Sequence, residues 1–391
     1  MKLISVIDDE EVFNLCLEKL NVASRPAQEP NTTQERKSKN HEKEGIMSRK
    51  LHFSMLLCAL VLVFSLGLCT QTIAAAKKAD YHFKWRLSQL MPANSDHDKR
   101  CKAFAQKVKE KTDGRVDITV YSGGVLGDWV NIYEYVMRGE VDMAMQPIAP
   151  TYDPRLNIAY YVPYLFTNTK EAKDAYQVGG WVYNMVEGLL KDQGIKGIAL
   201  YPAGWAGMTA TKEPESWQDM KPNGMKIRVM PIKACQLTWR TLGYIPSTIP
   251  YNEAYSAIER GVAQGESGGP PFQGYQFRDV QHVWIQYNDF LEPWWFFMNL
   301  KEWNQLTKHD QQVIIDAAEK QVDGRWDYFL KEDQDYRDKM RQYGMKVIVP
   351  SDAQLKIFAQ KVRAVVWPEL DKVVGKSLMD ICRKHAGMAG K

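Results

Sequence analysis

Residue types that often carry catalysis occur in this chain, but their spacing predicts neither an active site nor a metal site. A hydrolase would need a nucleophile on a sharp strand-to-helix turn, or two histidines at helical spacing. The histidines after residue 76 are isolated from one another along the chain, and the glycine-rich stretch 265–269 lacks the Lys of a phosphate-binding loop. These histidines are His82, His97, His282, His309 and His385. We therefore expect no enzyme, no cofactor and no bound metal.

The cysteines also predict no organised site. Of the six, Cys101, Cys235 and Cys382 follow residue 76, far apart in sequence. They allow at most one disulfide, and no two of them have the spacing of a redox pair or a zinc site.

Tryptophan is the side chain whose frequency is unusual. The chain has 12, and seven of them are considered as either core or binding-site residues. Most are expected in the core, because large aromatic side chains contribute much of the buried area of a protein. Several stand where a predicted strand ends, and these are candidates for the walls of a binding site. The seven are Trp129, Trp205, Trp217, Trp239, Trp284, Trp294 and Trp295.

Length and composition indicate a globular protein of two domains. The chain has 391 residues, of which 45% are hydrophobic and 25% are charged. The net charge of +4 is spread through mixed acidic and basic residues, without basic blocks. We therefore expect no nucleic-acid partner.

The N-terminal region resembles an export signal that does not begin at residue 1. Basic residues after Met47 precede an uncharged run, Met55–Leu68, and three alanines, Ala74–Ala76. The run is shorter than the roughly 20 residues of a membrane span, which favours a cleaved signal peptide over residues 47–76 and a periplasmic protein. An uncleaved anchor is the alternative. Residues 1–46 are interpreted as a misassigned extension or, if translated, as a disordered polar tail.

Alternating and helical patterns predict a first α/β lobe over residues 77–200. A strand over 81–87, a helix capped by Ser95, a strand over 116–120, a helix ending at Gly139 and a strand over 141–145 follow in order. This order is typical of a largely parallel sheet, which binds ligands beyond the carboxyl ends of its strands. We therefore expect a site near 122–129 and 146–150.

A second lobe is predicted over residues 201–300, with strands that cross between the lobes. The strands lie at 197–201 and 226–230, a helix at 252–261 and a crossing strand at 294–300. Residues 301–391 are predicted to form helices that pack across both lobes, the first capped by Thr307 and a later one by Ser351.

Three segments carry a resemblance to a known family. They are Tyr121–Gly127 (YSGGVLG), Gly139–Met143 (GEVDM) and Gly224–Met230 (GMKIRVM). Their order and spacing resemble the substrate-binding proteins of tripartite ATP-independent periplasmic (TRAP) transporters, the DctP family, over residues 81–385. The resemblance implies a two-lobed clamshell that closes over an organic acid, with membrane permease subunits as partners. It also implies that Arg228 clamps the carboxylate, for which a planar guanidinium is better suited than Lys.

At three places the chain departs from relatives that bind highly polar acids. Such relatives often have Arg, Arg and Asn where this chain has Asp128-Trp129, Gly204-Trp205-Ala206 and the segment 264–268. With fewer polar groups and more indoles, a sialic acid or a dicarboxylate is disfavoured. We expect a monocarboxylate with an aromatic or indole-type body. The alternatives are an aliphatic oxo- or hydroxy-acid ligand, or an exported enzyme.

The predicted site combines the clamp with an apolar wall. Trp129, Trp205 and Tyr251 are expected to form the walls, and Ser267 or Glu266 to hydrogen-bond a polar substituent. The predicted substrate-binding residues are Arg228, Trp205, Trp129, Tyr251, Met230, Ser267 and Glu266.

Overall fold

The computed structural model describes residues 81–388. The predicted extension over 1–46 and the signal peptide over 47–76 lie outside these residues and stay predictions. Within residues 81–388, no helix combines the length and apolar character needed to cross a bilayer.

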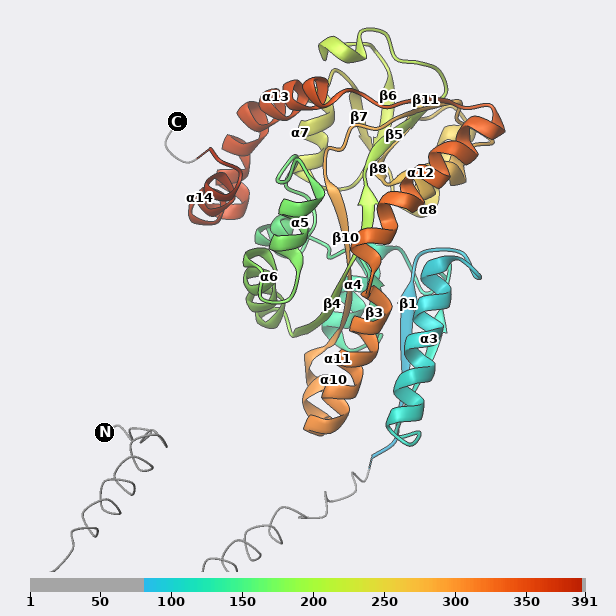
Figure 1. Ribbon diagram of the computed structural model, residues 1–391, viewed down its shortest axis with the longest axis vertical. Coiled ribbons are helices and arrows are strands. Elements are labelled where there is room, and N and C mark those ends of the chain that lie inside the picture. Colours follow the sequence, from blue (N-terminus) through green and yellow to red (C-terminus); the bar gives the residue numbers. More distant parts are fainter. Residues whose placement is uncertain (1–80, 389–391) are drawn as a thin grey trace, which may run out of the picture. The chain divides into compact units, whose positions relative to one another are not determined.

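The first sheet has five strands in the order β2-β1-β3-β10-β4 (Figure 1). β1 pairs in parallel with β2 and β3, whereas β10 runs antiparallel to β3 and β4. The predicted strand, helix, strand, helix, strand order at its start is confirmed. The strands are β1 (Phe83–Gln89), β2 (Val116–Tyr121), β3 (Met143–Gln146), β4 (Ile195–Trp205) and β10 (Leu291–Asn299).

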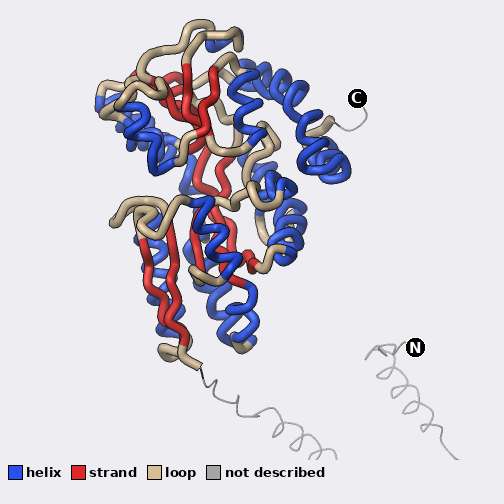
Figure 2. The backbone as a smooth tube through the Cα atoms, turned by 180° about the vertical axis from the view of Figure 1, so that it is seen from behind, coloured by secondary structure: helices blue, strands red, loops and turns tan. Residues whose placement is uncertain are grey.

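The second sheet has six strands in the order β11-β9-β5-β8-β6-β7. In Figure 2 the strands, drawn in red, form an upper and a lower group. β6 is parallel to both neighbours, β7 and β8, and β5 is antiparallel to β8 and β9. β11 differs from the predicted helical C-terminal third, because a short extended segment after α12 pairs with β9. The strands are β5 (Gly207–Ala210), β6 (Lys226–Val229), β7 (Ile245–Thr248), β8 (Gly265–Gly269), β9 (Val283–Ile285) and β11 (Lys346–Ile348).

The helices begin where the sequence supplies capping side chains. Ser95, Thr307 and Ser351 each accept a hydrogen bond from the backbone N–H three residues later, as predicted. The helices are α3 (Asp96–Lys111), α4 (Trp129–Arg138), α5 (Thr169–Tyr176), α6 (Trp181–Asp192), α7 (Lys233–Thr241), α8 (Tyr251–Glu259), α9 (Pro271–Gly274), α10 (Leu300–Gln305), α11 (Lys308–Val322), α12 (Arg325–Tyr343), α13 (Asp352–Leu370) and α14 (Lys376–His385), with short turns η1 (Pro154–Ala159), η2 (Trp217–Asp219), η3 (Tyr275–Phe277) and η4 (Asp371–Gly375).

Two stretches of backbone pass directly from one sheet to the other. β4 continues through Ala206 into β5, and β9 leads through residues 286–290 into β10. The two crossings are joined at Ala206, whose N–H donates to Phe290 O at 3.0 Å and whose carbonyl accepts from Asn288 N at 2.9 Å. α12 packs on both β4 and β11. The predicted lobe boundary at residue 200 falls inside β4, because this strand continues to Trp205 before the chain crosses to the second sheet at Ala206.

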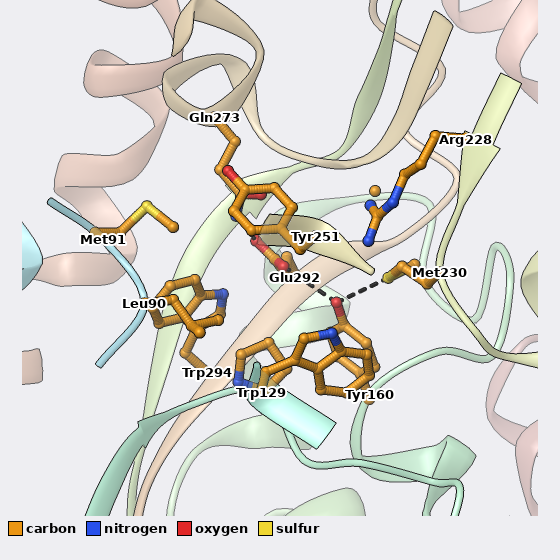
Figure 3. A pocket seen from close by; sticks show the side chains of 12 residues that line it. Leu90, Met91, Trp129, Tyr160, Arg228, Met230, Tyr251, Gln273, Glu292 and Trp294 are labelled. Atoms are coloured by element: carbon orange, nitrogen blue, oxygen red, sulfur yellow. Dashed lines mark hydrogen bonds between the residues drawn. The ribbon is translucent and has the colours of Figure 1, made fainter. Parts of the chain in front are cut away.

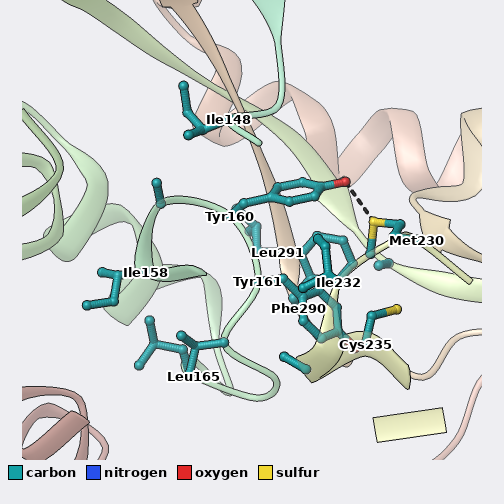
Figure 4. Close-up of a cluster of buried hydrophobic side chains, with 14 of the residues drawn as sticks. Ile148, Ile158, Tyr160, Tyr161, Leu165, Met230, Ile232, Cys235, Phe290 and Leu291 are labelled. Atoms are coloured by element: carbon teal, nitrogen blue, oxygen red, sulfur yellow. Dashed lines mark hydrogen bonds between the residues drawn. The ribbon is translucent and has the colours of Figure 1, made fainter. Parts of the chain in front are cut away.

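A buried apolar cluster lies beside these crossings (Figure 4). Ile148, Ile158 and Leu165 from the segment after β3 lie in one cluster with Ile232 and Cys235 near the start of α7. This shared core fixes the loop after β3 against the second sheet, so residues from both sheets can meet around one small volume.

Candidate ligand-binding site

A cavity lies where strands of both sheets end (Figure 3). Leu90 follows β1, Pro147 follows β3 and Met230 follows β6, so the carboxyl ends of parallel strands from both sheets border it. This is where open α/β sheets bind ligands, and it includes the predicted 146–150 loop. The lining residues are Leu90, Met91, Trp129, Pro147, Tyr160, Arg228, Met230, Tyr251, Gly268, Gln273, Glu292 and Trp294.

Arg228 is a buried cation at the edge of this cavity, with only 2% of its surface exposed. Its Nε donates to Ile249 O at 2.9 Å, and its Nη1 donates to Glu266 Oε1 at 2.9 Å and to Ser267 O at 3.3 Å. These bonds fix the plane of the guanidinium. Within residues 81–388 the structure gives Nη2 no hydrogen-bond partner, so Nη2 is the donor that remains for a ligand.

Glu266 and Ser267 support Arg228 and are not in the cavity lining. Arg228 and Glu266 face each other in register on neighbouring parallel strands, β6 and β8, and form a buried ion pair at 2.9 Å. Burial raises the pKa of Glu266, and the adjacent guanidinium opposes that rise. Glu266 and Ser267 were predicted to hydrogen-bond the ligand. In this structure both accept hydrogen bonds from Arg228 and so hold its guanidinium in position.

The remaining walls are mostly aromatic. Trp129, the first residue of α4, packs against Tyr160 with ring centroids 5.4 Å apart. Tyr251, the first residue of α8, lies with its ring centroid 5.5 Å from the Arg228 guanidinium carbon. Trp294 from β10 completes the lining. The structure thus brings together Arg228, Trp129, Tyr251 and Met230, as the sequence predicted.

Glu292 is a polar group of the cavity that the sequence analysis missed. Its carboxyl lies 2.7 Å from Gln273 Nε2 and 3.2 Å from the Tyr160 hydroxyl, which also contacts Met230 Sδ at 2.9 Å. Burial raises the pKa of Glu292 to about 8, so at neutral pH this carboxyl is mostly protonated and can donate a hydrogen bond. A lone Glu inside the apolar run Leu291–Asn299 is the signal that could have identified it.

Trp205 is not in the cavity lining, which corrects its predicted role as a wall. It is the last residue of β4, where the chain leaves the first sheet. Its indole N–H donates to Thr169 Oγ1 at 3.1 Å, and its backbone N–H donates to Asp333 Oδ2 at 3.1 Å. Gln286 Nε2 donates to its carbonyl at 2.8 Å. Trp205 therefore stabilises the crossing between the sheets.

The cavity is narrow in this conformation. Its volume is about 20 Å³, which is room for about one water molecule. An organic acid can enter only if the lining side chains or the two sheets move apart, as expected for a site that closes around its ligand.

Residues 87–370 match the family model of bacterial extracellular solute-binding proteins, family 7. The chain belongs to this family, the DctP family, which confirms the resemblance to TRAP substrate-binding proteins and identifies a binding protein that is not an enzyme. A solute-binding protein of Chromohalobacter salexigens is 26% identical over 64% of this chain and 74% of its own length. A monocarboxylate 2-oxoacid-binding periplasmic protein of Nostoc is 25% identical over 64% of this chain and 69% of its own length.

The fold also matches solved structures. A TRAP periplasmic solute-binding protein from Desulfovibrio salexigens, solved with orotic acid, superposes with a TM-score of 0.71 at 20% identity and covers 78% of this chain and all of its own. The predicted two-lobed α/β fold is thereby confirmed. The chain is a solute-binding protein of a family whose members bind small organic acids.

Proposed function

We propose that this protein is the periplasmic component of a TRAP transporter and that it captures a monocarboxylate with an apolar, aromatic body for delivery to membrane permease subunits. The observation that carries the proposal is the position of Arg228. Its guanidinium is held by three hydrogen bonds, and the cavity it borders is walled by Trp129, Tyr160, Tyr251 and Trp294. A carboxylate pairs well with such a donor, and an apolar body is favoured by the rings.

A second candidate is an aliphatic 2-oxo- or 2-hydroxy-acid. It is favoured by the polar groups beside the rings, because Gln273 and a protonated Glu292 could hydrogen-bond an oxygen next to the ligand carboxylate. The small cavity volume also suits a short acid. The name of the Nostoc relative points to the same class of ligand for that protein.

Mass spectrometry of the small molecules that copurify with the folded protein, followed by calorimetric titration, tests both candidates. An aromatic acid should bind more tightly than pyruvate or lactate of the same charge. Tighter binding of pyruvate would replace the first candidate with the second. If no carboxylate binds, or if binding does not depend on Arg228, the proposal of a carboxylate receptor is wrong.

A further inference from the structure

A second cavity adjoins the first on the far side of Met91. Its volume is about 350 Å³, compared with about 20 Å³ for the first cavity. Met91 is the one residue that lines both. Trp294 of the first cavity also packs against His97 of the second, with ring centroids 4.6 Å apart. The second cavity is lined by Met91, Ser95, Asp96, His97, Phe272, Tyr275, Gln276, Glu332, Tyr336 and Lys339.

Met91 has a fixed backbone and a buried side chain, which is 2% exposed and packs in the apolar cluster of the first sheet. The Gln89 side chain bonds both backbone groups of Met91, each at 2.7 Å, and Gly123 N–H donates to Met91 O at 2.9 Å. The thioether sulfur, a weak acceptor, receives a hydrogen bond from Gln276 Nε2 at 3.4 Å. Methionine has three rotatable side-chain bonds and adapts to irregular space. Rotation of this side chain would join the two cavities without moving the chain that carries it.

The second cavity is lined by three aromatic rings together with polar and charged side chains. Phe272 and Tyr275 lie with ring centroids 6.2 and 5.8 Å from that of Tyr336. Glu332, Tyr336 and Lys339 share one face of α12, at spacings of four and three residues. Asp96 and Glu332 place carboxylates in the lining, each already paired with an arginine. The cavity therefore suits an aromatic or aliphatic body whose far end donates a hydrogen bond.

We infer that the two cavities form one bipartite site and that the ligand is an elongated acid, with its carboxylate at Arg228 and its body extending past Met91 into the second cavity. This inference rests on the proposed function and names its ligand class more narrowly. In this conformation the first cavity has room for about one water molecule, whereas the adjoining cavity of about 350 Å³ has room for an aromatic body. The binding free energy then has two sources: the contact between the ligand carboxylate and Arg228, and the burial of the ligand body in the second cavity.

Calorimetric titration of the full-length mature protein with 3-phenylpropionate and 6-phenylhexanoate tests the inference. The longer acid should bind more tightly. Tyr336→Ala removes a wall of the second cavity and should weaken 6-phenylhexanoate about tenfold, with less than about twofold change for 3-phenylpropionate. Gln276→Phe should have the same selective effect by filling the space. Tyr328→Ala is the matched control, since Tyr328 lies on the same helix, is 44% exposed and is not in the lining.

Three outcomes would overturn the inference. Equal weakening of both acids by Tyr336→Ala would mean that the variant acts through the fold. If 3-phenylpropionate binds through Arg228 and the longer acid gains nothing, the second cavity is not part of the site, and the proposed function stands. If neither acid binds, or if binding does not depend on Arg228, both the inference and the proposed function fail.

Discussion

The two sides of the first cavity differ in what they offer a ligand. The side built on the first sheet contributes Trp129, Tyr160 and Trp294, which are aromatic rings. The side built on the second sheet contributes the ring of Tyr251 and the charge of Arg228, which is held in place by Glu266 on the neighbouring strand. The partner for a carboxylate therefore lies on one side, whereas most of the rings lie on the other.

This difference suggests why closure and recognition are coupled. A carboxylate pairs with Arg228 on the second-sheet side, whereas the body of the ligand contacts the three rings on the first-sheet side. A ligand that has both groups contacts both sides at once, so it stabilises the closed conformation more than either fragment does. A variant at Arg228 should thus weaken the binding of every carboxylate, whereas a variant among the rings should weaken mainly the binding of aromatic acids. The size of each loss should follow the free energy that the removed contact contributes.

The largest effect is expected from removal of the guanidinium. Arg228→Met alone leaves Glu266 as an unpaired buried carboxylate, which costs about 3 to 5 kcal/mol in a typical protein, so the variant is best combined with Glu266→Gln. The double variant should fold and should lose about 2 to 5 kcal/mol of binding free energy for every carboxylate. Arg228→Lys should recover part of this loss, because Lys offers a point charge without the planar fork.

Calorimetry gives the affinities and a thermal melt checks folding. If the folded double variant binds acids as tightly as the unmodified protein, Arg228 is not the carboxylate clamp and the proposed division between the two sides is wrong.

A smaller and selective effect is expected on the first-sheet side. Trp129→Ala should weaken aromatic acids by about 1 to 3 kcal/mol through lost burial and ring contact, and should change the affinity for a short acid much less. The ratio between the two affinities is the measured quantity. Trp205→Ala is the matched control, because this indole lies at the crossing between the sheets. It should lower the melting temperature and leave the ratio unchanged. A change in the ratio for Trp205→Ala alone would reinstate Trp205 as a wall.

A substitution at Gly268, a glycine that lines the cavity beside Arg228 and Met230, should have an intermediate to small effect on affinity. Gly268 has φ +133°, and an added Cβ would lie 3.3 Å from Met230 Cγ and 3.5 Å from Arg228 Nη1. Gly268→Ala should strain the backbone by about 1 to 3 kcal/mol and shift Met230, which lines the cavity, so affinity should fall several-fold. Gly224→Ala is the control, with φ +70° and nothing within 4 Å of the added Cβ. Both should lose stability in a denaturant titration, but only Gly268→Ala should lose affinity.

The sequence predicted the elements whose signals are local. Capping side chains such as Ser95 and Thr307 act on their own helix, and alternating residues report burial within one strand. β8 was missed because three of its five residues are glycine, a residue depleted in strands. Its glycines permit close approach, since a Cβ at Gly265 would lie 2.8 Å from Thr209 O and one at Gly269 would lie 2.2 Å from Gln273 Oε1.

On each side, some of the predicted site residues line the cavity and others do not. Arg228 could be found because its strand has a recognisable sequence. Trp205 and Trp129 both stand at the edge of an element, and local sequence does not decide which of them turns toward the cavity. That choice depends on long-range contacts, namely Thr169 and Asp333 for Trp205 and Tyr160 for Trp129. Tyr160 itself lies in a segment with no predicted element.

The smallest expected effect is a dependence of affinity on pH, and it comes from Glu292, where the two sides meet. Burial raises its pKa to about 8. Below that pH the carboxyl is protonated and can donate to a ligand oxygen. Above it the carboxylate repels the ligand carboxylate, by about 1 to 2 kcal/mol for a separation of roughly 10 Å and an effective dielectric constant near 20. Affinity should therefore be constant up to about pH 7.5 and fall about fivefold by pH 9.

Glu292→Gln is the variant that isolates this group, because an amide donates a hydrogen bond at every pH. Its affinity should stay constant from pH 7 to 9. The same proton also affects stability: the folded state keeps it up to about pH 8, whereas an unfolded Glu releases it near its ordinary value of 4.5. The contribution of Glu292 to the free energy of unfolding should therefore fall as pH rises between these values, and the difference between the two proteins should grow with pH. Asp289 and Asp333, whose pKa values are raised to about 7 and about 8, cancel in that difference. A pH profile that is identical in both proteins would assign the effect to those carboxyls and remove Glu292 from ligand recognition.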